Sequence, residues 1–148
     1  MPAKIRLIQV GDLDVIIEIF IRTYSKEPWN EEWDYATLKE RIMDFILNNT
    51  GLNYCAIDKE GKILGVMFGR RNYWIKSKEY FIDEFFIDYK LQNKGIGHFM
   101  INEVSKIIQK NGYSCMILNT EKGFPCEKFY LKNGFVQKES NIFIYKVL

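Results

Sequence analysis

The stretch Phe85-Phe86-Ile87-Asp88-Tyr89-Lys90-Leu91-Gln92-Asn93-Lys94-Gly95-Ile96-Gly97-His98 carries the strongest fold signal in this chain. Before it, residues alternate from Ile82 in a run rich in aromatic and β-branched side chains, which is typical of a strand. After it, apolar residues recur at helical spacing until Asn111-Gly112, where we expect the helix to end. A strand is therefore predicted to pass through a polar turn and a pair of glycines directly into a helix.

A turn of this kind is suited to binding an anion. Gly95 and Gly97 let the backbone approach a ligand closely, and the first N–H groups of the following helix have no helical partner. A phosphate group matches both the charge and the geometry. The dinucleotide fingerprint requires a small residue where Met100 stands, and the P-loop requires Lys and then Ser or Thr where His98 and Phe99 stand.

The pattern that remains is Gln92-x-x-Gly95-x-Gly97, and it resembles the acyl-CoA pyrophosphate loop of the GNAT superfamily of N-acetyltransferases. A second segment, 129–135 (Phe-Tyr-Leu-Lys-Asn-Gly-Phe), is similar to the closing segment of that superfamily. The resemblance extends from Ile5 to about Ile144. It implies acetyl-CoA as co-substrate, with backbone groups of Phe86 and Ile87 on the pantetheine arm. The pyrophosphate would be held by the backbone of Gln92, Asn93, Lys94, Gly95, Ile96, Gly97 and His98.

Composition limits the alternatives. The 148 residues, 47% hydrophobic and 27% charged, favour one domain over residues 1–148, and the resemblance implies that it is a single N-acetyltransferase domain. A net charge of +2 with scattered basic residues does not favour a nucleic-acid partner. We find neither a membrane-length apolar run nor a signal peptide, and we expect no membrane association. Three widely spaced cysteines fit buried thiols in the cytoplasm, and a single histidine excludes a histidine-rich metal site, so no metal is expected.

The order of expected elements indicates an α/β fold of α+β type. Strands are predicted at 5–10, 54–58, 63–70, 81–89 and 115–119, with a closing strand at 142–147. Helices are predicted after Asp12, expected to cap the first of them, at 35–47 and from Gly95. The helix from Gly95 is a crossover, which makes the strands around it parallel. We expect a mixed sheet of about six to seven strands with helices on both faces, and the resemblance implies that the fourth and fifth strands splay apart.

Two residues are candidates for catalysis. The resemblance implies that Glu84 removes the proton of an acceptor amine, directly or through water; the alternative is a solvent-facing carboxylate or a structural ion pair. Tyr130 aligns with the tyrosine that many members use to protonate the leaving thiolate, and the alternative is a core tyrosine. Where members often carry Asn and Ala upstream of that tyrosine, this chain has Gly123 and Cys126. A nucleophilic role for Cys126 is rejected because no basic partner is evident.

The acceptor is predicted from the segment Glu27-Pro28-Trp29-Asn30-Glu31-Glu32-Trp33-Asp34. Indoles of Trp29 and Trp33, interleaved with carboxylates such as Glu32, suit a small cationic amine, and Asp83 would add negative charge. The alternative is that the indoles pack on the core while the acids cap the next helix. A polyamine, an amino-sugar antibiotic, an amino acid, a protein N-terminus and a lysine all stay open.

Two functions of other classes are also compatible with the sequence. The chain could bind acyl-CoA without turnover, as a sensor or interaction module, or it could bind another nucleotide. Retention of both Glu84 and Tyr130 favours an enzyme. The closing strand could pair within the monomer or across a homodimer.

Overall fold

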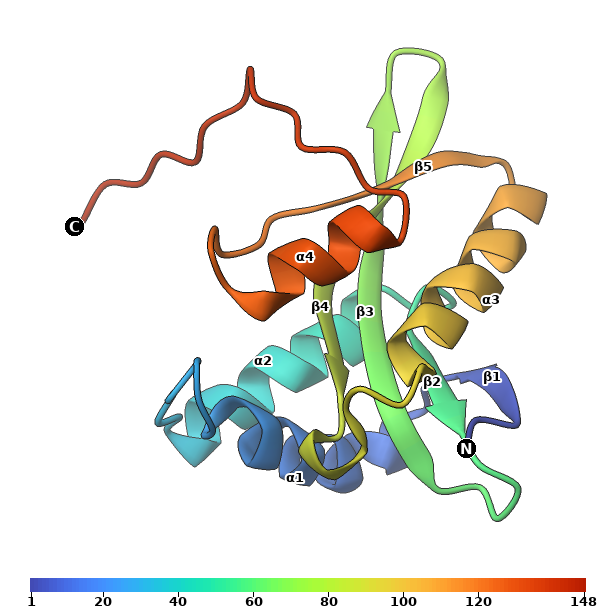
Figure 1. Ribbon diagram of the computed structural model, residues 1–148, viewed down its shortest axis with the longest axis vertical. Helices are drawn as coiled ribbons and strands as arrows, with labels where there is room; N and C mark the ends of the chain where they lie inside the picture. The colour runs from blue at the N-terminus through green and yellow to red at the C-terminus, as the bar shows by residue number, and fades with distance from the viewer.

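The computed structural model describes all 148 residues, and its centre is a five-stranded sheet in the order β1-β2-β3-β4-β5 (Figure 1). The strands are β1 (Lys4–Leu7), β2 (Tyr54–Ile57), β3 (Ile63–Trp74), β4 (Ser77–Ile87) and β5 (Tyr113–Leu118). Neighbours pair antiparallel except β4 and β5, which are parallel. The parallel pair is joined through α3 (Ile96–Lys110), as the predicted crossover requires.

Helices cover both faces of the sheet, as predicted, and each face has its own core. One core joins α1 (Leu13–Tyr24) and α2 (Tyr35–Asn48) to side chains such as Phe68 and Phe86. The other joins α3 to side chains such as Met67 and Tyr80. Phe129 of α4 (Pro125–Lys132) packs against this second core. The apolar periodicity of α1, α2 and α3 thus buries their inward stripes as expected.

The helix starts show one correction. Asp34 caps α2 as an Asx cap should, because its carboxylate accepts from the backbone N–H of Thr37 at 2.9 Å. Asp12 does not cap α1. Its carboxylate accepts from Gln9 N at 2.8 Å and from Arg6 at 2.8 and 3.0 Å, so it closes the short 3-10 turn Val10–Asp12 instead.

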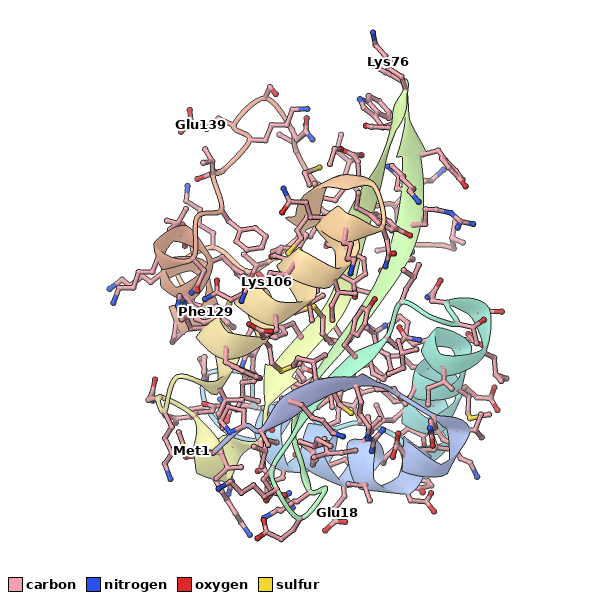
Figure 2. The ribbon with its side chains drawn as sticks, turned by 90° about the vertical axis from the view of Figure 1, so that its right-hand side faces the viewer. Met1, Glu18, Lys76, Lys106, Phe129 and Glu139 are labelled. Atoms are coloured by element: carbon pink, nitrogen blue, oxygen red, sulfur yellow. The ribbon has the colours of Figure 1, made fainter.

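The hairpin of β3 and β4 is longer than predicted. Polar and aromatic residues that pair with each other extend it past Arg70, and Figure 2 shows Lys76 at its tip, beyond the rest of the sheet. The register shifts between Phe68 and Gly69 on β3, which leaves Asp83 of β4 without a paired residue, a β-bulge. The bulge lies next to Glu84 and shifts which side chains of β4 point to each face of the sheet. The predicted functional residues of β4 begin at this point.

The predicted strand count is too high. Residues 136–148 form no strand, and each of them is exposed. The chain leaves the body of the molecule after α4, as Figure 1 shows, so the predicted closing strand at 142–147 finds no partner in this chain. The apolar pattern of that segment is strand-like, but a strand also requires a neighbour.

The structure also bears on the predictions about membrane helices and about the burial of the cysteines. No helix combines the length and the apolar character needed to cross a membrane. Cys55 is a buried thiol as predicted, whereas Cys115 is exposed and Cys126 is half-buried. Cys115 lies on β5, the last strand of the sheet, where no further strand covers it.

Candidate active site

The loop between β4 and α3 presents a row of unpaired backbone N–H groups. Asn93 (φ 62°) and Gly95 (φ 84°) adopt the left-handed conformation, which turns the chain sharply before the helix. No backbone N–H group from Gln92 to His98 donates to an acceptor within the protein, and the next one, of Phe99, donates to Gly95 O at 3.0 Å. Successive free N–H groups at a helix start form a concave site for an anion.

An ion pair anchors this loop to α1. Asp88 is buried, and its two carboxylate oxygens accept from Arg22 Nε at 2.9 Å and Nη2 at 2.7 Å. The Arg22 hydrogen bonds hold the pKa of the Asp88 carboxyl below its ordinary value. The same carboxylate caps the turn that follows through Lys90 N at 3.2 Å. Gln92 of the motif adds a bond from its side chain to Ile87 O at 3.3 Å, so it fixes the loop to the end of β4.

The start of α3 lies close to α4. A Cβ on Gly97 would lie 3.0 Å from the ring of Phe129, which explains the glycine at this position. His98 joins the same two helices, with Nδ1 2.5 Å from Asn133 Oδ1 and Nε2 3.0 Å from Asn102 Nδ2. The two segments that resemble the superfamily, the glycine loop and the segment 129–135, are therefore in contact.

The strands β4 and β5 separate as predicted. Their pairing ends at Ile82 and Leu118, while β4 continues to Ile87. Asp88 N donates to Leu64 O at 3.0 Å, and antiparallel pairing engages alternate residues, so Phe86 directs its backbone groups to β3. The backbone groups of Phe85 and Ile87 lie on the other side of the strand, where Ile87 O already accepts from Thr23 Oγ1 and from Gln92 Nε2, each at 3.3 Å. A ligand that paired with this open edge would therefore meet the backbone of Phe85 and the N–H group of Ile87, whereas the predicted Phe86 pairs with β3.

A cavity of about 380 Å³ opens at the point where these strands separate. Glu84 and Tyr130 both line it, from β4 and α4, and so do residues of α1, of α2 and of the chain after β5. The remaining lining residues are Tyr24, Trp29, Glu31, Trp33, Arg41, Ile82, Asp83, Phe85, Leu118, Asn119, Thr120, Glu121, Cys126 and Phe143.

Glu84 is held on both of its carboxylate oxygens. Oε2 accepts from Arg41 Nε at 3.1 Å and Nη2 at 3.0 Å, and Oε1 accepts from Tyr24 Oη at 3.3 Å. Burial raises the pKa of the Glu84 carboxyl above its ordinary value, although the charge and hydrogen bonds of Arg41 act in the opposite direction. The ion pair that the sequence offered as an alternative thus exists, on a carboxylate that also faces the cavity.

Tyr130 lies in an aromatic cluster at the other wall. Its ring packs against Phe129, Phe135 and Phe85, with ring centroids 5.3, 5.3 and 6.4 Å away. Burial raises the pKa of the Tyr130 phenol above its ordinary value, and the neighbouring Cys126 and Glu84 act in the same direction. The phenol is therefore protonated at neutral pH and available as a hydrogen-bond donor.

The predicted acceptor segment lines the cavity in part. Trp29 and Trp33 do so, as does Asp83, whose Oδ1 accepts from Arg70 Nε at 3.1 Å. Glu32 is exposed and does not line the cavity; its neighbour Glu31 does, and accepts from Trp33 Nε1 at 2.7 Å. Trp33 also meets Phe20 of the core edge-on at 5.4 Å, so this indole both packs on the core and lines the cavity.

Several cavity residues have no motif in the sequence. Arg41 lies on the inward side of α2, between the buried positions Leu38 and Ile42, and a charge within an apolar stripe was the available signal. For Tyr24 at the end of α1 and for the segment 119–121 after β5, the sequence carries no signal that would place them at the cavity. Cys126 lies 3.0 Å from Thr120 Oγ1, a contact with a hydroxyl and not with a base.

The sequence from residue 13 to residue 135 matches the model of the acetyltransferase (GNAT) family. The chain belongs to the acetyltransferase (GNAT) family. The matched region contains both the glycine loop and Tyr130, and the activity of an acyltransferase follows from this membership. Members of the GNAT family generally use acetyl-CoA as donor.

Solved structures agree with the fold of this GNAT domain. A possible acetyltransferase from Clostridium difficile 630 superposes with a TM-score of 0.82 at 20% identity, covering 100% of this chain and 99% of that one. A GNAT family acetyltransferase from Staphylococcus aureus gives 0.71 at 18% identity, with 100% of each chain covered. An aminoglycoside acetyltransferase from an uncultured soil metagenomic sample, in complex with sisomicin, gives 0.71 at 19% identity, covering 98% and 95%. No curated protein matches the sequence.

Proposed function

We propose that this chain transfers the acetyl group of acetyl-CoA to the primary amine of a small cationic molecule. The observation that carries the proposal is that Glu84 and Tyr130, on different elements, line one cavity at the point where β4 and β5 separate. A carboxylate and a phenol on facing walls are the two groups that amine acetylation needs, one near the amine and one near the leaving sulfur.

The donor side is supported by the backbone. The free N–H groups from Gln92 to His98 suit the negative charge of a pyrophosphate. The edge of β4 from Asp83 to Ile87, which β5 does not cover, suits an extended amide-containing arm that pairs as a strand would. A donor held this way would run along β4 from the loop toward Glu84 and the cavity.

The acceptor side is supported by charge and by aromatic surface. Four carboxylates line the cavity, those of Glu31, Asp83, Glu84 and Glu121, against one guanidinium, that of Arg41. Indole faces of Trp29 and Trp33 add sites for cation–π contact. An amino sugar or a polyamine fits this chemistry, and the structural neighbour in complex with sisomicin is in keeping with an amino-sugar acceptor.

Glu84 would act as the base. An amine with a pKa of about 10.4 is almost entirely protonated at pH 7, and exposing its lone pair costs about 4.6 kcal/mol. A carboxyl whose pKa is raised by burial holds a proton better than a surface carboxyl, so it is the better base for this step. It would take the proton directly or through a water molecule.

Tyr130 would serve the leaving group. A thiol has a pKa of about 8.5, below that of the buried phenol, so complete proton transfer from Tyr130 to the thiolate is uphill. A hydrogen bond from the phenol to the developing thiolate still lowers the barrier, because the charge on sulfur appears only as the bond to carbon breaks. The proton released by the amine can then reach the thiolate.

The test is release of free CoA thiol from acetyl-CoA in the presence of amines that are cationic, neutral or anionic. We expect turnover with cationic acceptors and a loss of about 10²-fold in kcat for Tyr130→Phe, the size typical of one lost transition-state hydrogen bond. Tyr73→Phe, at an exposed tyrosine of the hairpin, is the matched control and should keep the wild-type rate. Binding of acetyl-CoA without thiol release above hydrolysis for any amine would favour a sensor over an enzyme.

A further inference from the structure

The hairpin of β3 and β4 ends in an exposed apolar tip. Tyr73, Trp74 and Ile75 are 70%, 59% and 89% exposed, and Figure 2 shows the neighbouring Lys76 at the far end of the molecule. Side chains of adjacent strand residues point to opposite faces, so Tyr73 and Trp74 place aromatic rings on both sides of the hairpin. The whole end of the hairpin is therefore apolar, and not one of its faces alone.

The turn at this tip contains a residue that its backbone conformation disfavours. Ile75 and Lys76 form a two-residue turn between the paired residues Trp74 and Ser77. Ile75 has φ of 53°, in the left-handed region that such turns usually fill with glycine or asparagine, and a β-branched side chain is disfavoured there. Ile75 belongs to neither core, so no burial within the chain offsets this strain. Burial of its side chain against something outside the chain would offset it.

Positive charge surrounds the tip. Residues 71–78 include Arg71, Lys76 and Lys78 and no acidic residue. None of these three basic side chains forms an ion pair. The guanidinium of Arg71 lies 5.0 Å from the ring centroid of Tyr73, which holds the charge beside the apolar end. Lys76 and Lys78 also line a hollow of about 330 Å³ between the tip and Gly112. The surface around the tip is therefore complementary to an anionic partner.

We propose that this hairpin tip, residues 71–78, docks the protein end-on onto a membrane surface that contains anionic lipids. Ile75 enters the edge of the acyl region, the rings of Tyr73 and Trp74 lie at the level of the head groups, and the basic side chains meet the lipid phosphates. From Tyr73 to Ile75 a strand extends about 7 Å, which matches the depth of about 5–10 Å to which interfacial segments are buried. Lys76 has a side chain long enough to return its ammonium group to the head groups.

Other occupants fit these features less well. A nucleic acid would contact the aromatic and basic side chains, but it has little use for an aliphatic residue at the very end, and a net charge of +2 is low for such a partner. A flat protein surface would cover one face of the hairpin and leave the ring on the other face in water. A lipid layer surrounds the end on all sides. The sequence-based expectation of no membrane association came from the lack of a membrane-length run and a signal peptide, and neither is needed for docking of this kind.

Docking at the tip leaves the active site in water. The run of β4 from Ser77 to Glu84 extends about 20 Å. The cavity would therefore lie above the head groups, where it can take an acceptor from solution close to the membrane. The docking itself does not depend on the proposed acetyl transfer and is tested without it.

The first test is flotation of the full chain with vesicles of phosphatidylcholine alone, or of phosphatidylcholine and phosphatidylglycerol in equal parts. We expect binding to the mixed vesicles and not to phosphatidylcholine alone. Lys76→Gln should weaken this binding about fivefold, and Ile75→Asp should weaken it more than about tenfold. Val15→Asp on α1 and Lys39→Gln on α2, both at exposed positions, are the matched controls and should bind as the wild type does.

Three results of this test would overturn the proposal. They are equal binding to both kinds of vesicle, no binding to either, and a loss in the control variants as large as that in the tip variants. Because Ile75 is exposed and outside both cores, Ile75→Asp should keep the thermal unfolding midpoint of the wild type, so a loss of binding reports on the tip and not on the fold.

The second test uses Trp74 as a reporter of the docked surface. Its indole should leave water on binding, so tryptophan emission should shift to shorter wavelength when the mixed vesicles are added. Trp74→Phe should remove the shift, because the other tryptophans, Trp29 and Trp33, line the active-site cavity. A shift that persists in Trp74→Phe would place the contact elsewhere and contradict the proposal. Tighter binding to polyuridylate than to the mixed vesicles would also contradict it, in favour of a nucleic-acid partner.

Discussion

At the scale of single residues, one carboxylate, that of Glu84, both forms an ion pair with Arg41 and lines the cavity, where we propose that it acts as the base. Arg41 and Tyr24 fix its orientation, and burial raises the pKa of the Glu84 carboxyl, which makes it a better proton acceptor above that pKa. The ion pair with Arg41 fixes the orientation of the Glu84 carboxylate, and burial makes that carboxylate more basic. An enzyme whose base has a raised pKa loses activity on acidification at a higher pH than an enzyme whose base is an ordinary carboxylate.

We therefore predict an acid limb in the pH profile of kcat/KM that Glu84→Gln removes. As pH falls through the raised pKa, the wild-type carboxylate is protonated and activity is lost; the amide cannot titrate, and its rate should be lower by about 10²-fold or more. Glu79→Gln, on the same strand but outside the cavity lining, is the control and should keep the limb. An unchanged rate and profile in Glu84→Gln would assign this residue a structural role alone.

The residue scale also shows what the sequence could and could not predict. Glu84 and Tyr130 were predicted as candidates because the resemblance marks their positions, and both line the same cavity. The partners of Glu84 were missed because Arg41 and Tyr24 stand 43 and 60 positions away in the sequence, and no local pattern connects positions so far apart. Glu31 was missed in favour of Glu32 because a loop has no period that says which of two adjacent side chains faces a cavity.

At the scale of elements, the loop before α3 depends on backbone conformation more than on side chains. Gly95 has φ of 84°, and a Cβ there would meet nothing within 4 Å, so only the left-handed conformation opposes a larger residue. We predict that Gly95→Ala lowers the free energy of unfolding by about 1 kcal/mol and raises the KM for acetyl-CoA. Gly11→Ala, where the Cβ also has open space and φ is not positive, should do neither. Denaturant unfolding and initial rates measure both effects.

The joint between α1 and this loop is an ion pair whose effect on stability should depend on pH. Arg22 lowers the pKa of the Asp88 carboxyl in the folded state. The ion pair therefore stabilises the fold above the unfolded-state pKa of about 3.9, and this contribution is lost as pH falls through the lower folded-state pKa. We predict that Asp88→Asn costs about 3 kcal/mol near neutral pH and that the difference from wild type shrinks below about pH 4.

Chemical denaturation at several pH values measures this difference. Asp83→Asn is a suitable comparison, because Asp83 is paired with Arg70 at a more exposed position and a partly exposed pair contributes less than about 1 kcal/mol. A difference for Asp88→Asn that is small at neutral pH, or that grows in acid, would contradict the role assigned to this pair.

Helices were predicted more accurately than strand ends. The apolar stripes of α1, α2 and α3 repeat at a helical period that the sequence displays directly. Apart from the buried Tyr80, the outer parts of β3 and β4 carry polar and aromatic residues that are exposed or half-buried, and their pairing with each other makes them strands. Pairing depends on two segments at once. A strand predicted from the pattern of one segment alone is therefore shorter than the paired strand in the structure.

At the scale of the whole molecule, a mixed sheet with a parallel crossover follows from the order of elements, and the separation of β4 and β5 creates the site. The predicted strand total is wrong because one apolar segment lies outside the sheet of its own chain. The apolar pattern of residues 142–147 is typical of a strand, but it does not show whether a neighbouring strand is present to pair with it.

The most direct measurement is the mass of the acceptor after reaction. Purified protein is incubated with acetyl-CoA and either a polyamine or an aminoglycoside, and the amine is analysed by mass spectrometry beside a reaction with Tyr130→Phe. Addition of one acetyl group to a cationic amine, strongly reduced in the variant, is the result expected from the cavity formed by Glu84, Tyr130 and their acidic neighbours. Acetylation confined to neutral or anionic amines, or no acetylated product at all while acetyl-CoA binds, would contradict it.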